Sequence, residues 1–312
     1  RDLVRSRGLG DVYKRQFYKC SWIIFVCCIF FSCTNHMQER IQYTLHQAGE
    51  NSSELKKVLD HYQNQPEKLK AARFLIANIP AHRTYVGKEI DSLKQMKKES
   101  IQQGRISDEI VTHWKSFDYS SSQVVKDIDV IKADILIENI DLAFETWEKR
   151  SWSKQYSFED FCEYVLPYRI GDEPLEKWRR IYYERYSPVL DSLYQGNDVV
   201  EAARVMANYL KEEGFTNHTD FNLPHLGALF LLENRVGYCR DNCDIATYVM
   251  RSLGIPITMD FYEMSPSYNS RHFWSALIDT TGLVVPFNYI EREIVRRPQE
   301  ERKKGKVYRT CY

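Results

Sequence analysis

A glycine, a cysteine and a helical segment follow one another between residues 237 and 256. Gly237 lies two positions before Cys239. Apolar residues recur at helical spacing after the cysteine, at Ile245, Val249 and Leu253. Gly254 and Pro256 then provide a stop, because glycine favours the end of a helix and proline prevents its resumption. The segment predicts a helix that begins at Cys239, where free N–H groups and the helix macrodipole favour a thiolate.

Two strands are predicted after this helix. Residues 257–262 form the first strand, and residues 271–279 form the second, with His272 near its start. A cysteine at a helix tip and a histidine on a neighbouring strand are the two groups that nucleophilic catalysis by a thiol requires.

These residues resemble the core of the transglutaminase-like superfamily, a relative of the papain-like fold. The resemblance covers about residues 225–290. It rests on three stretches: Gly-Tyr-Cys at 237–239, Arg-Ser-Leu-Gly-Ile-Pro at 251–256 and His-Phe-Trp at 272–274. It favours Cys239 over Cys243 as the nucleophile, because Arg251 and Gly254 follow Cys239 at the distances usual in the family. It implies an α+β fold, with the cysteine on a helix N-terminus and the histidine on an antiparallel strand.

The third member of the site departs from the family pattern. Where the family usually shows Pro-Leu-Asp, this chain has Pro-Phe-Asn at 286–288. Asparagine orients the histidine in papain-like sites, so the resemblance implies the catalytic set Cys239, His272 and Asn288. Asn288 is equally a turn former in this sequence. Asp279 is the alternative third member, although the sequence from Asp279 to Gly282 is typical of a hairpin turn.

Three further residues are assigned to substrate binding: Tyr168, Arg169 and Trp274. Tyr168 and Arg169 lie in a turn bounded by proline and glycine, where they either line a substrate cleft or form a packed corner between domains, with Arg169 paired to a carboxylate. Trp274 is either a wall of the site or part of the core.

Of the eight cysteines, those beyond the N-terminal segment are too sparse for a disulfide scaffold. Four lie near the N-terminus, at Cys20, Cys27, Cys28 and Cys33, and four lie beyond it, at Cys162, Cys239, Cys243 and Cys311. Cys239 and Cys243 lie about one helical turn apart, and a disulfide between them is the main alternative to catalysis. The spacing of cysteine and histidine matches no standard zinc pattern, and we expect no metal and no cofactor.

The N-terminus is typical of an exported protein. Residues 1–16 lack an initiating methionine and are interpreted as a non-native remnant, followed by a signal peptide at 17–33. Its apolar run, 21–33, is too short to span a bilayer. The run ends in Phe-Phe-Ser-Cys, which resembles a lipobox and predicts lipidation of Cys33, with an ordinary signal peptide or an uncleaved anchor as alternatives. We expect a lipid-anchored protein of the bacterial cell envelope.

The rest of the chain divides into two predicted domains. Residues 34–150 form a helical domain, with helices that begin near Ser52, Pro66 and Ser107 and a long helix over 127–149. Residues 151–312 form the transglutaminase-like domain, which includes helices at 174–195 and 198–213. Because 306–312 reads as a strand that has just begun, we expect this domain to be truncated. The stretches 71–76 and 161–169 also resemble surface lipoproteins of Bacteroidota that carry transglutaminase-like domains.

The charge balance argues against a nucleic-acid partner, since 43 basic and 43 acidic residues give a formal net charge of zero. The sequence therefore predicts an exported thiol enzyme that cleaves or transfers at amide bonds of peptide, protein or peptidoglycan-type substrates through an acyl-enzyme. The alternative is a catalytically silent surface module that binds peptide or glycan.

Overall fold

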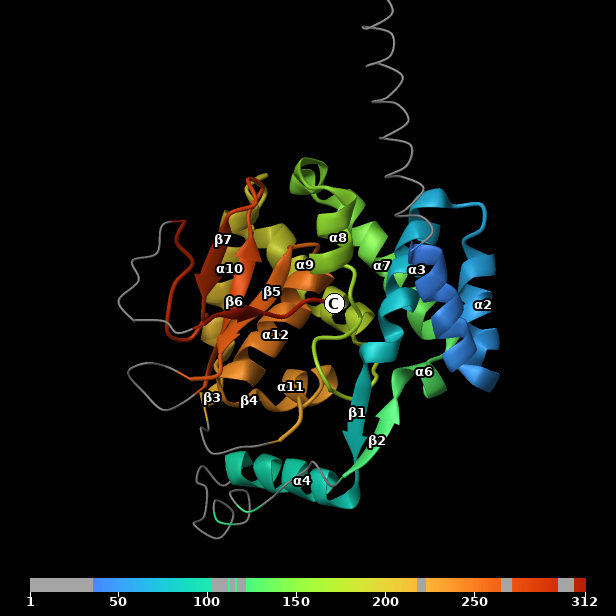
Figure 1. The fold of residues 1–312 in the computed structure, drawn as a ribbon. Coiled ribbons are helices and arrows are strands. Elements are labelled where there is room, and N and C mark those ends of the chain that lie inside the picture. The colour runs from blue at the N-terminus through green and yellow to red at the C-terminus, as the bar shows by residue number, and fades with distance from the viewer. Residues whose placement is uncertain are drawn as a thin grey trace, which may run out of the picture.

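Helices from the first part of the chain pack against one another beside a separate antiparallel sheet (Figure 1). This computed structural model describes residues 36–102, 112, 116, 122–217, 223–264, 271–296 and 306–312. The helical region and the four-stranded sheet confirm the predicted α+β class. The predicted leader with Cys33 and the helix start predicted at Ser107 lie outside the described residues. Across the described part of the chain, no helix has the length and apolar character needed to cross a membrane.

The N-terminal region is built from a helix over 36–47 and three packed helices: α2 (Ser52–His61), α3 (Pro66–Asn78) and α7 (Ala133–Lys149). Short 3-10 turns, η1 (Gly49–Asn51) and η2 (Ile79–Ala81), connect them to their neighbours. Leu55, Leu75 and Ile140 are fully buried where α2, α3 and α7 meet. Pro66 occupies the first turn of α3, where a missing N–H costs nothing.

The long helix predicted over 127–149 is wrong, because the structure breaks it into α6 (Asp127–Val130) and α7. The amide of Asn51 donates hydrogen bonds to the carbonyl oxygens of Ile128 and Ile131, at 3.1 and 2.9 Å. These carbonyls therefore face Asn51, and the backbone at Ile131 is extended. Glu54 accepts the N–H of Ala133 at 2.9 Å and caps the new helix.

A connecting segment leads to the second half of the molecule through η4 (Ser151–Gln155) and α8 (Phe158–Tyr164). Ser157 and Asp160 form the reciprocal capping box at the start of α8. The next helix, α9 (Trp178–Leu193), begins four residues later than the predicted start at residue 174. The residues between form tertiary contacts instead of a helical turn: the Glu176 carboxylate accepts the N–H of Leu229 at 3.0 Å.

Helix α12 (Cys239–Ser252) lies at the centre of the second half, with the sheet on one side and α9 and α10 (Val199–Glu213) on the other (Figure 1). The segment before it contains β3 (Thr216–Asn217), α11 (Ala228–Asn234) and β4 (Val236–Gly237), with β3 and β4 parallel. As predicted, α12 ends before Gly254, whose φ of 70° suits a glycine helix stop.

The sheet has the strand order β7-β6-β5-β8, and every neighbouring pair is antiparallel. Its strands are β5 (Ile257–Tyr262), β6 (His272–Ile278), β7 (Val284–Phe287) and β8 (Tyr308–Arg309). The predicted strands at 257–262 and 271–279 are therefore confirmed, whereas the strand expected at 306–312 is limited to the two residues of β8. Asp279 forms the predicted hairpin turn, with its carboxylate accepting the N–H groups of Thr281 and Leu283.

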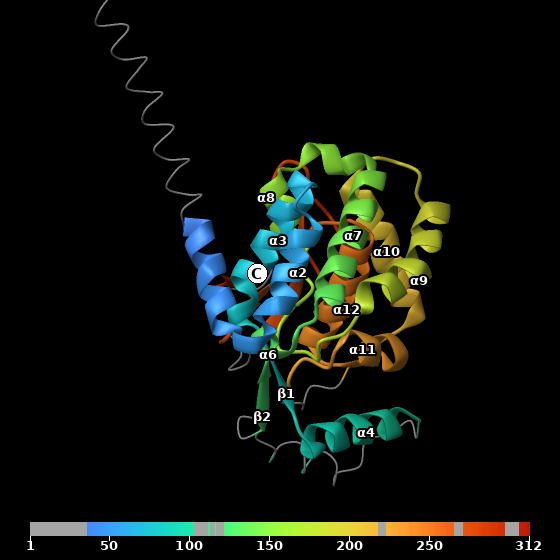
Figure 2. The ribbon, with the colours of Figure 1, turned by 90° about the vertical axis from the view of Figure 1, so that its right-hand side faces the viewer.

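A two-stranded arm projects from the body of the molecule (Figure 2). It consists of β1 (Arg83–Val86) and β2 (Gln123–Lys126), which pair in antiparallel fashion. Helix α4 (Lys88–Gln102) follows β1 and lies below α11 in both views (Figures 1 and 2).

Candidate functional site

The predicted nucleophile, Cys239, is the first residue of α12, as the sequence indicates. The carboxylate of Asp241 accepts the N–H of Tyr238 at 3.0 Å, which fixes the turn that leads into the helix. A Cβ on Gly237 would collide with this carboxylate. The glycine of the Gly-x-Cys pattern therefore leaves room for the group that shapes the nucleophile turn.

The Cys239 thiol lies against the beginning of β6. The backbone N–H of Phe273 points to the sulfur, and the Phe273 ring meets the Tyr238 ring edge-on, with centroids 6.0 Å apart. Burial raises the pKa of the thiol, the Phe273 N–H opposes this, and the Asp241 carboxylate adds to the increase. The net effect is a raised pKa, which opposes the resting thiolate that the sequence predicts. Cys239 keeps its proton at neutral pH and requires a base.

His272, the predicted base, is the residue directly before Phe273. Its half-buried ring lies 5.9 Å from the Tyr262 ring and is stacked 6.1 Å from the Trp274 ring. Side chains alternate along a strand, so His272 and Trp274 share one face of the sheet. Phe273 lies on the other face, where it packs with the buried apolar residues of α12. The structure brings β6 to the thiol, but the contact between the imidazole and the sulfur stays a prediction.

The surroundings of Asn288 fit a turn former, and those of Trp274 fit a residue of the core. Asn288 is buried, and its amide oxygen accepts the N–H groups of Ile290 and Glu291 at 3.0 and 3.3 Å. These two bonds form a turn and compete with any role in orienting His272. Trp274 is only 8% exposed, as a packing residue would be. Asp279 lies at the opposite end of β6 from His272, so it does not serve as the third member.

The disulfide alternative is absent from the structure, because Cys239 and Cys243 are both free thiols. Cys243 is fully buried on the sheet side of α12, and burial raises its pKa well above the ordinary value. Cys239 is partly exposed and is therefore the cysteine of this pair that a substrate can reach.

Tyr168 and Arg169 form the packed corner that was the alternative to a substrate cleft. Arg169 is 2% exposed and pairs with both carboxylate oxygens of Asp127, and the bond from its Nε measures 2.6 Å. The Tyr168 hydroxyl donates to the same carboxylate at 2.9 Å. Arg169 also donates to Thr84 at 2.9 Å, which anchors the base of the β1–β2 arm. Both residues are committed to structure.

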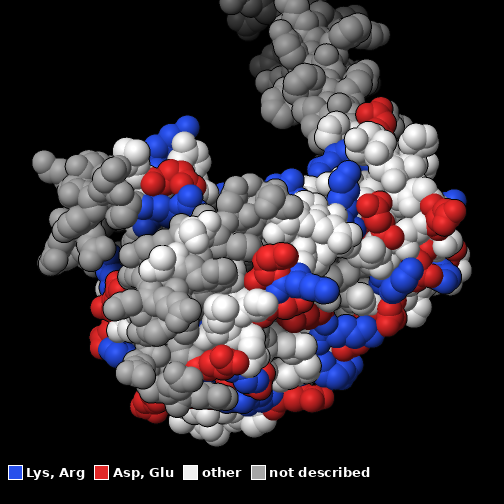
Figure 3. Space-filling view, turned by 90° about the horizontal axis from the view of Figure 1, so that it is seen from below, with Lys and Arg blue, Asp and Glu red and all other residues white. Residues whose placement is uncertain are grey.

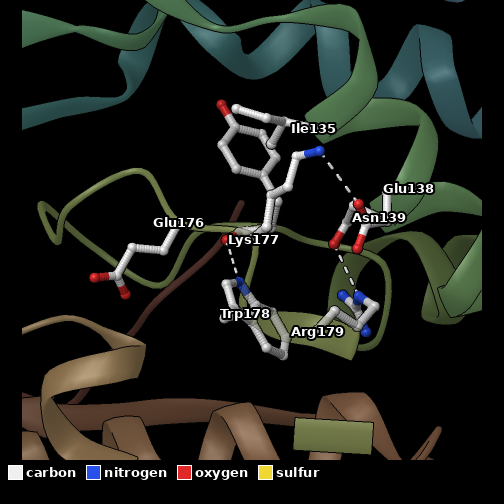
Figure 4. Close-up of a pocket in the computed structure, with 8 residues that line it drawn as sticks. Ile135, Glu138, Asn139, Glu176, Lys177, Trp178 and Arg179 are labelled. Atoms are coloured by element: carbon white, nitrogen blue, oxygen red, sulfur yellow. Dashed lines mark hydrogen bonds and ion pairs between the residues drawn. The ribbon is translucent and has the colours of Figure 1, made fainter. Parts of the chain in front are cut away.

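A small cavity beside this corner has room for about one water molecule, with a volume of about 10 Å³ (Figure 4). Lys177 reaches Glu138 across it, and Arg179 donates to Asn139 at 2.8 Å. A groove of about 840 Å³ lies over α2, α7 and the start of α9, where acidic and basic side chains are mixed. Neither space is lined by Cys239 or His272. Among the described residues, no group of three or more His, Cys, Asp or Glu side chains is placed to hold a metal ion.

Sequence reasoning missed two charged features of α12. Asp241 caps the nucleophile turn, and Asp244 pairs with the His225 ring nitrogen Nδ1 at 2.7 Å. The Asp244 carboxylate raises the pKa of His225 against the effect of burial. The Asp241 cap was readable from its position three residues after Tyr238. The pairing of Asp244 with His225 depends on tertiary packing and has no local signal.

Comparisons with known proteins give little further guidance. No protein-family model matches the chain, and no curated protein matches it. Among solved structures, the chain is similar to a "Putative Cysteine Protease from Cytophaga hutchinsonii". The sequences are 12% identical, the match covers 44% of this chain and 50% of the other, and the TM-score is 0.29.

Proposed function

We propose that the protein is a thiol hydrolase or acyltransferase of transglutaminase-like type, with Cys239 as its nucleophile. One observation carries this proposal: a free, partly exposed thiol lies at the tip of a buried helix, against the strand that begins with His272. Such a thiol is available to a substrate while its surroundings are fixed by Asp241 and by the Phe273 N–H.

The raised pKa of Cys239 shapes the proposed reaction, because the proton must leave the sulfur as it attacks. In the proposed reaction the thiol proton passes to His272, whose ring lies with Trp274 on the sheet face away from α12 and must reach the sulfur round the start of β6. The sulfur then bonds to an amide carbonyl carbon, and the backbone N–H of Cys239 stabilises the oxyanion. The imidazolium returns the proton to the leaving amine as the C–N bond breaks, which leaves a thioester. Water resolves the thioester in hydrolysis, and a second amine resolves it in transfer.

The substrate class and the location belong to the same proposal. The sequence resemblance supports peptide, protein or peptidoglycan-derived amides as substrates. The lipobox-like sequence supports lipidation at Cys33 and attachment in the bacterial cell envelope.

A catalytically silent binding module is the second candidate, and specific observations favour it. The His272 ring packs on Trp274, Asn288 is occupied in a turn, and the Cys239 thiol is protonated at rest. A chain that keeps the scaffold for peptide or glycan capture would tolerate all three.

Product analysis separates the two candidates. The purified protein is incubated with peptide and muropeptide mixtures, and mass spectrometry is used to search for new amines, cross-links and an acyl adduct on Cys239. The enzyme predicts products with the wild type and with the matched cysteine variant Cys311→Ser, and none with Cys239→Ala or His272→Ala. Retention of peptide or glycan by all four proteins without any product would support the binding module and contradict the enzyme.

A further inference from the structure

The turn that follows β7 lies beside the end of β6 that meets Cys239. In the sheet, Phe287 at the end of β7 is opposite Ser275 of β6, and the chain then continues toward the start of β6. The Ser275 side chain bonds to the Cys243 thiol, and the Phe273 N–H points to the Cys239 sulfur, so α12 and β6 run side by side in the same direction. The residues after Phe287 therefore lie near the tip of α12.

Hydrogen bonds hold this turn in place. The Asn288 amide oxygen accepts the N–H groups of Ile290 and Glu291, and the Asn288 carbonyl accepts the Arg292 N–H at 2.7 Å. These bonds fix the backbone at Glu291, whose side chain is exposed. The turn therefore presents a carboxylate to solvent from a fixed position near the nucleophile.

Two carboxylates act on the Cys239 thiol. The largest charge effects on the thiol come from Asp241 and Glu291, and both raise its pKa. Asp241 is 1% exposed and accepts the Tyr238 N–H, so its carboxylate is closed to a substrate. Glu291 is exposed, and its carboxylate is open to a group that binds beside the thiol.

The other charges of the molecule give no competing preference for one sign. Arg271, at the start of β6, pairs with Glu263 at 3.1 Å, and Arg292 has a smaller effect on the thiol than Glu291. The chain has a formal net charge of zero, and acidic and basic side chains are intermixed on the face shown in Figure 3. A charge preference at Cys239 must therefore come from the groups close to it.

We propose that Glu291 selects substrates that carry a positive charge beside the reactive amide, such as a lysine or arginine side chain or a free amino group. The carboxylate attracts the cation as the amide approaches the thiol and repels an acidic neighbour. This inference rests on the proposed function, because it concerns the acyl substrate of Cys239. It gives Asn288 a positioning role, since Asn288 holds the turn that carries Glu291.

The test compares two methanethiosulfonates of opposite charge, the (trimethylammonium)ethyl and the sulfonatoethyl reagents. In each reaction the thiolate attacks the sulfenyl sulfur, a disulfide forms and methanesulfinate leaves. The rate at Cys239 in the full chain is measured by quenched labelling and peptide mapping. Both reagents need the same thiolate, so changes in the ratio of the cationic to the anionic rate report the charge beside the sulfur.

Glu291→Gln should lower this ratio about fivefold, the effect of one unit charge at contact distance in water. Glu291→Lys should lower it further. Glu293→Gln is the matched control and should leave the ratio unchanged, because Glu293 is also exposed but acts on Arg204 of α10. Salt at about 1 M should bring the wild-type ratio close to that of Glu291→Gln, since charges are then screened within about 3 Å.

An equal ratio in the wild type and Glu291→Gln, or the same decrease in Glu293→Gln, would overturn the role of Glu291. With peptide mixtures, the wild type should favour amides next to lysine or arginine, and Glu291→Lys should shift the preference to amides next to aspartate or glutamate. Turnover without any such preference would overturn the selection and leave the enzyme in place. A ratio that responds in a protein without turnover would count against the enzyme and leave the attraction of cations by Glu291 in place.

Discussion

Asp241 affects Cys239 in two opposing ways. Its carboxylate fixes the nucleophile turn by accepting the Tyr238 N–H, and its negative charge raises the pKa of the neighbouring thiol. Geometry and charge are separable here, because an asparagine side chain keeps an oxygen acceptor and loses the charge.

Asp241→Asn should therefore lower the pKa of Cys239 and speed its alkylation near neutral pH. The larger thiolate fraction should make the reaction several times faster. The measurement is the pH dependence of Cys239 alkylation by iodoacetamide, followed by peptide mapping. Asp198→Asn is the control, because Asp198 also caps a helix start, as the N-cap residue of α10 that accepts the Val200 N–H at 2.9 Å, and lies away from Cys239. Equal rates in Asp241→Asn and the wild type would contradict the electrostatic role.

The boundary between α6 and α7 shows how one polar side chain divides a helix. The Asn51 amide donates hydrogen bonds to two carbonyl groups that, in an uninterrupted helix, would accept the helix's own N–H groups. The side chain is buried, so these carbonyls have little access to water as an alternative partner.

Asn51→Ala should lower the free energy of unfolding by about 1–3 kcal/mol, the usual cost of leaving buried polar groups without a partner. Urea denaturation followed by circular dichroism measures the change. Ser53→Ala removes an exposed hydroxyl in the adjoining turn and should change stability by less than about 0.5 kcal/mol. Similar losses in both variants would show that Asn51 does not hold the break.

The sequence predicted those elements whose signals are local. Helix α12, its stop at Gly254 and the strands β5 and β6 follow from spacing over a few residues. The break before α7 was missed because its cause, Asn51, lies about 80 positions away in the chain. In the candidate site, the position of Cys239 was predictable, whereas its protonation was not. Burial and the Asp241 charge set its pKa, and both depend on packing.

The two halves of the molecule meet at a buried corner that joins the helical region to the C-terminal residues. The ion pair between Arg169 and Asp127 lies in this corner, and the His82 ring stacks on Tyr312 with centroids 4.6 Å apart. Burial lowers the pKa of His82 to about 4, so the ring is neutral in the folded protein at pH 7.

Stability should therefore fall in mildly acidic solution. The contribution of neutral His82 is fully present above its unfolded pKa near 6.5 and is lost as the pH falls toward 4. Between pH 7 and pH 5, the loss should be about 2 kcal/mol. Denaturant unfolding of the wild type and of His82→Phe, which keeps an aromatic ring against Tyr312, measures it. An equal loss in both proteins would assign the pH dependence to other groups.

The proposal that His272 accepts the Cys239 proton is tested by the pH–rate profile of Cys239 alkylation in wild type and His272→Ala. If the imidazole reaches the thiol, the wild type should show a reactive component near neutral pH, well below the raised pKa of the thiol. That component should vanish in His272→Ala. A single titration at the raised pKa of the thiol, identical in both proteins, would contradict the enzyme.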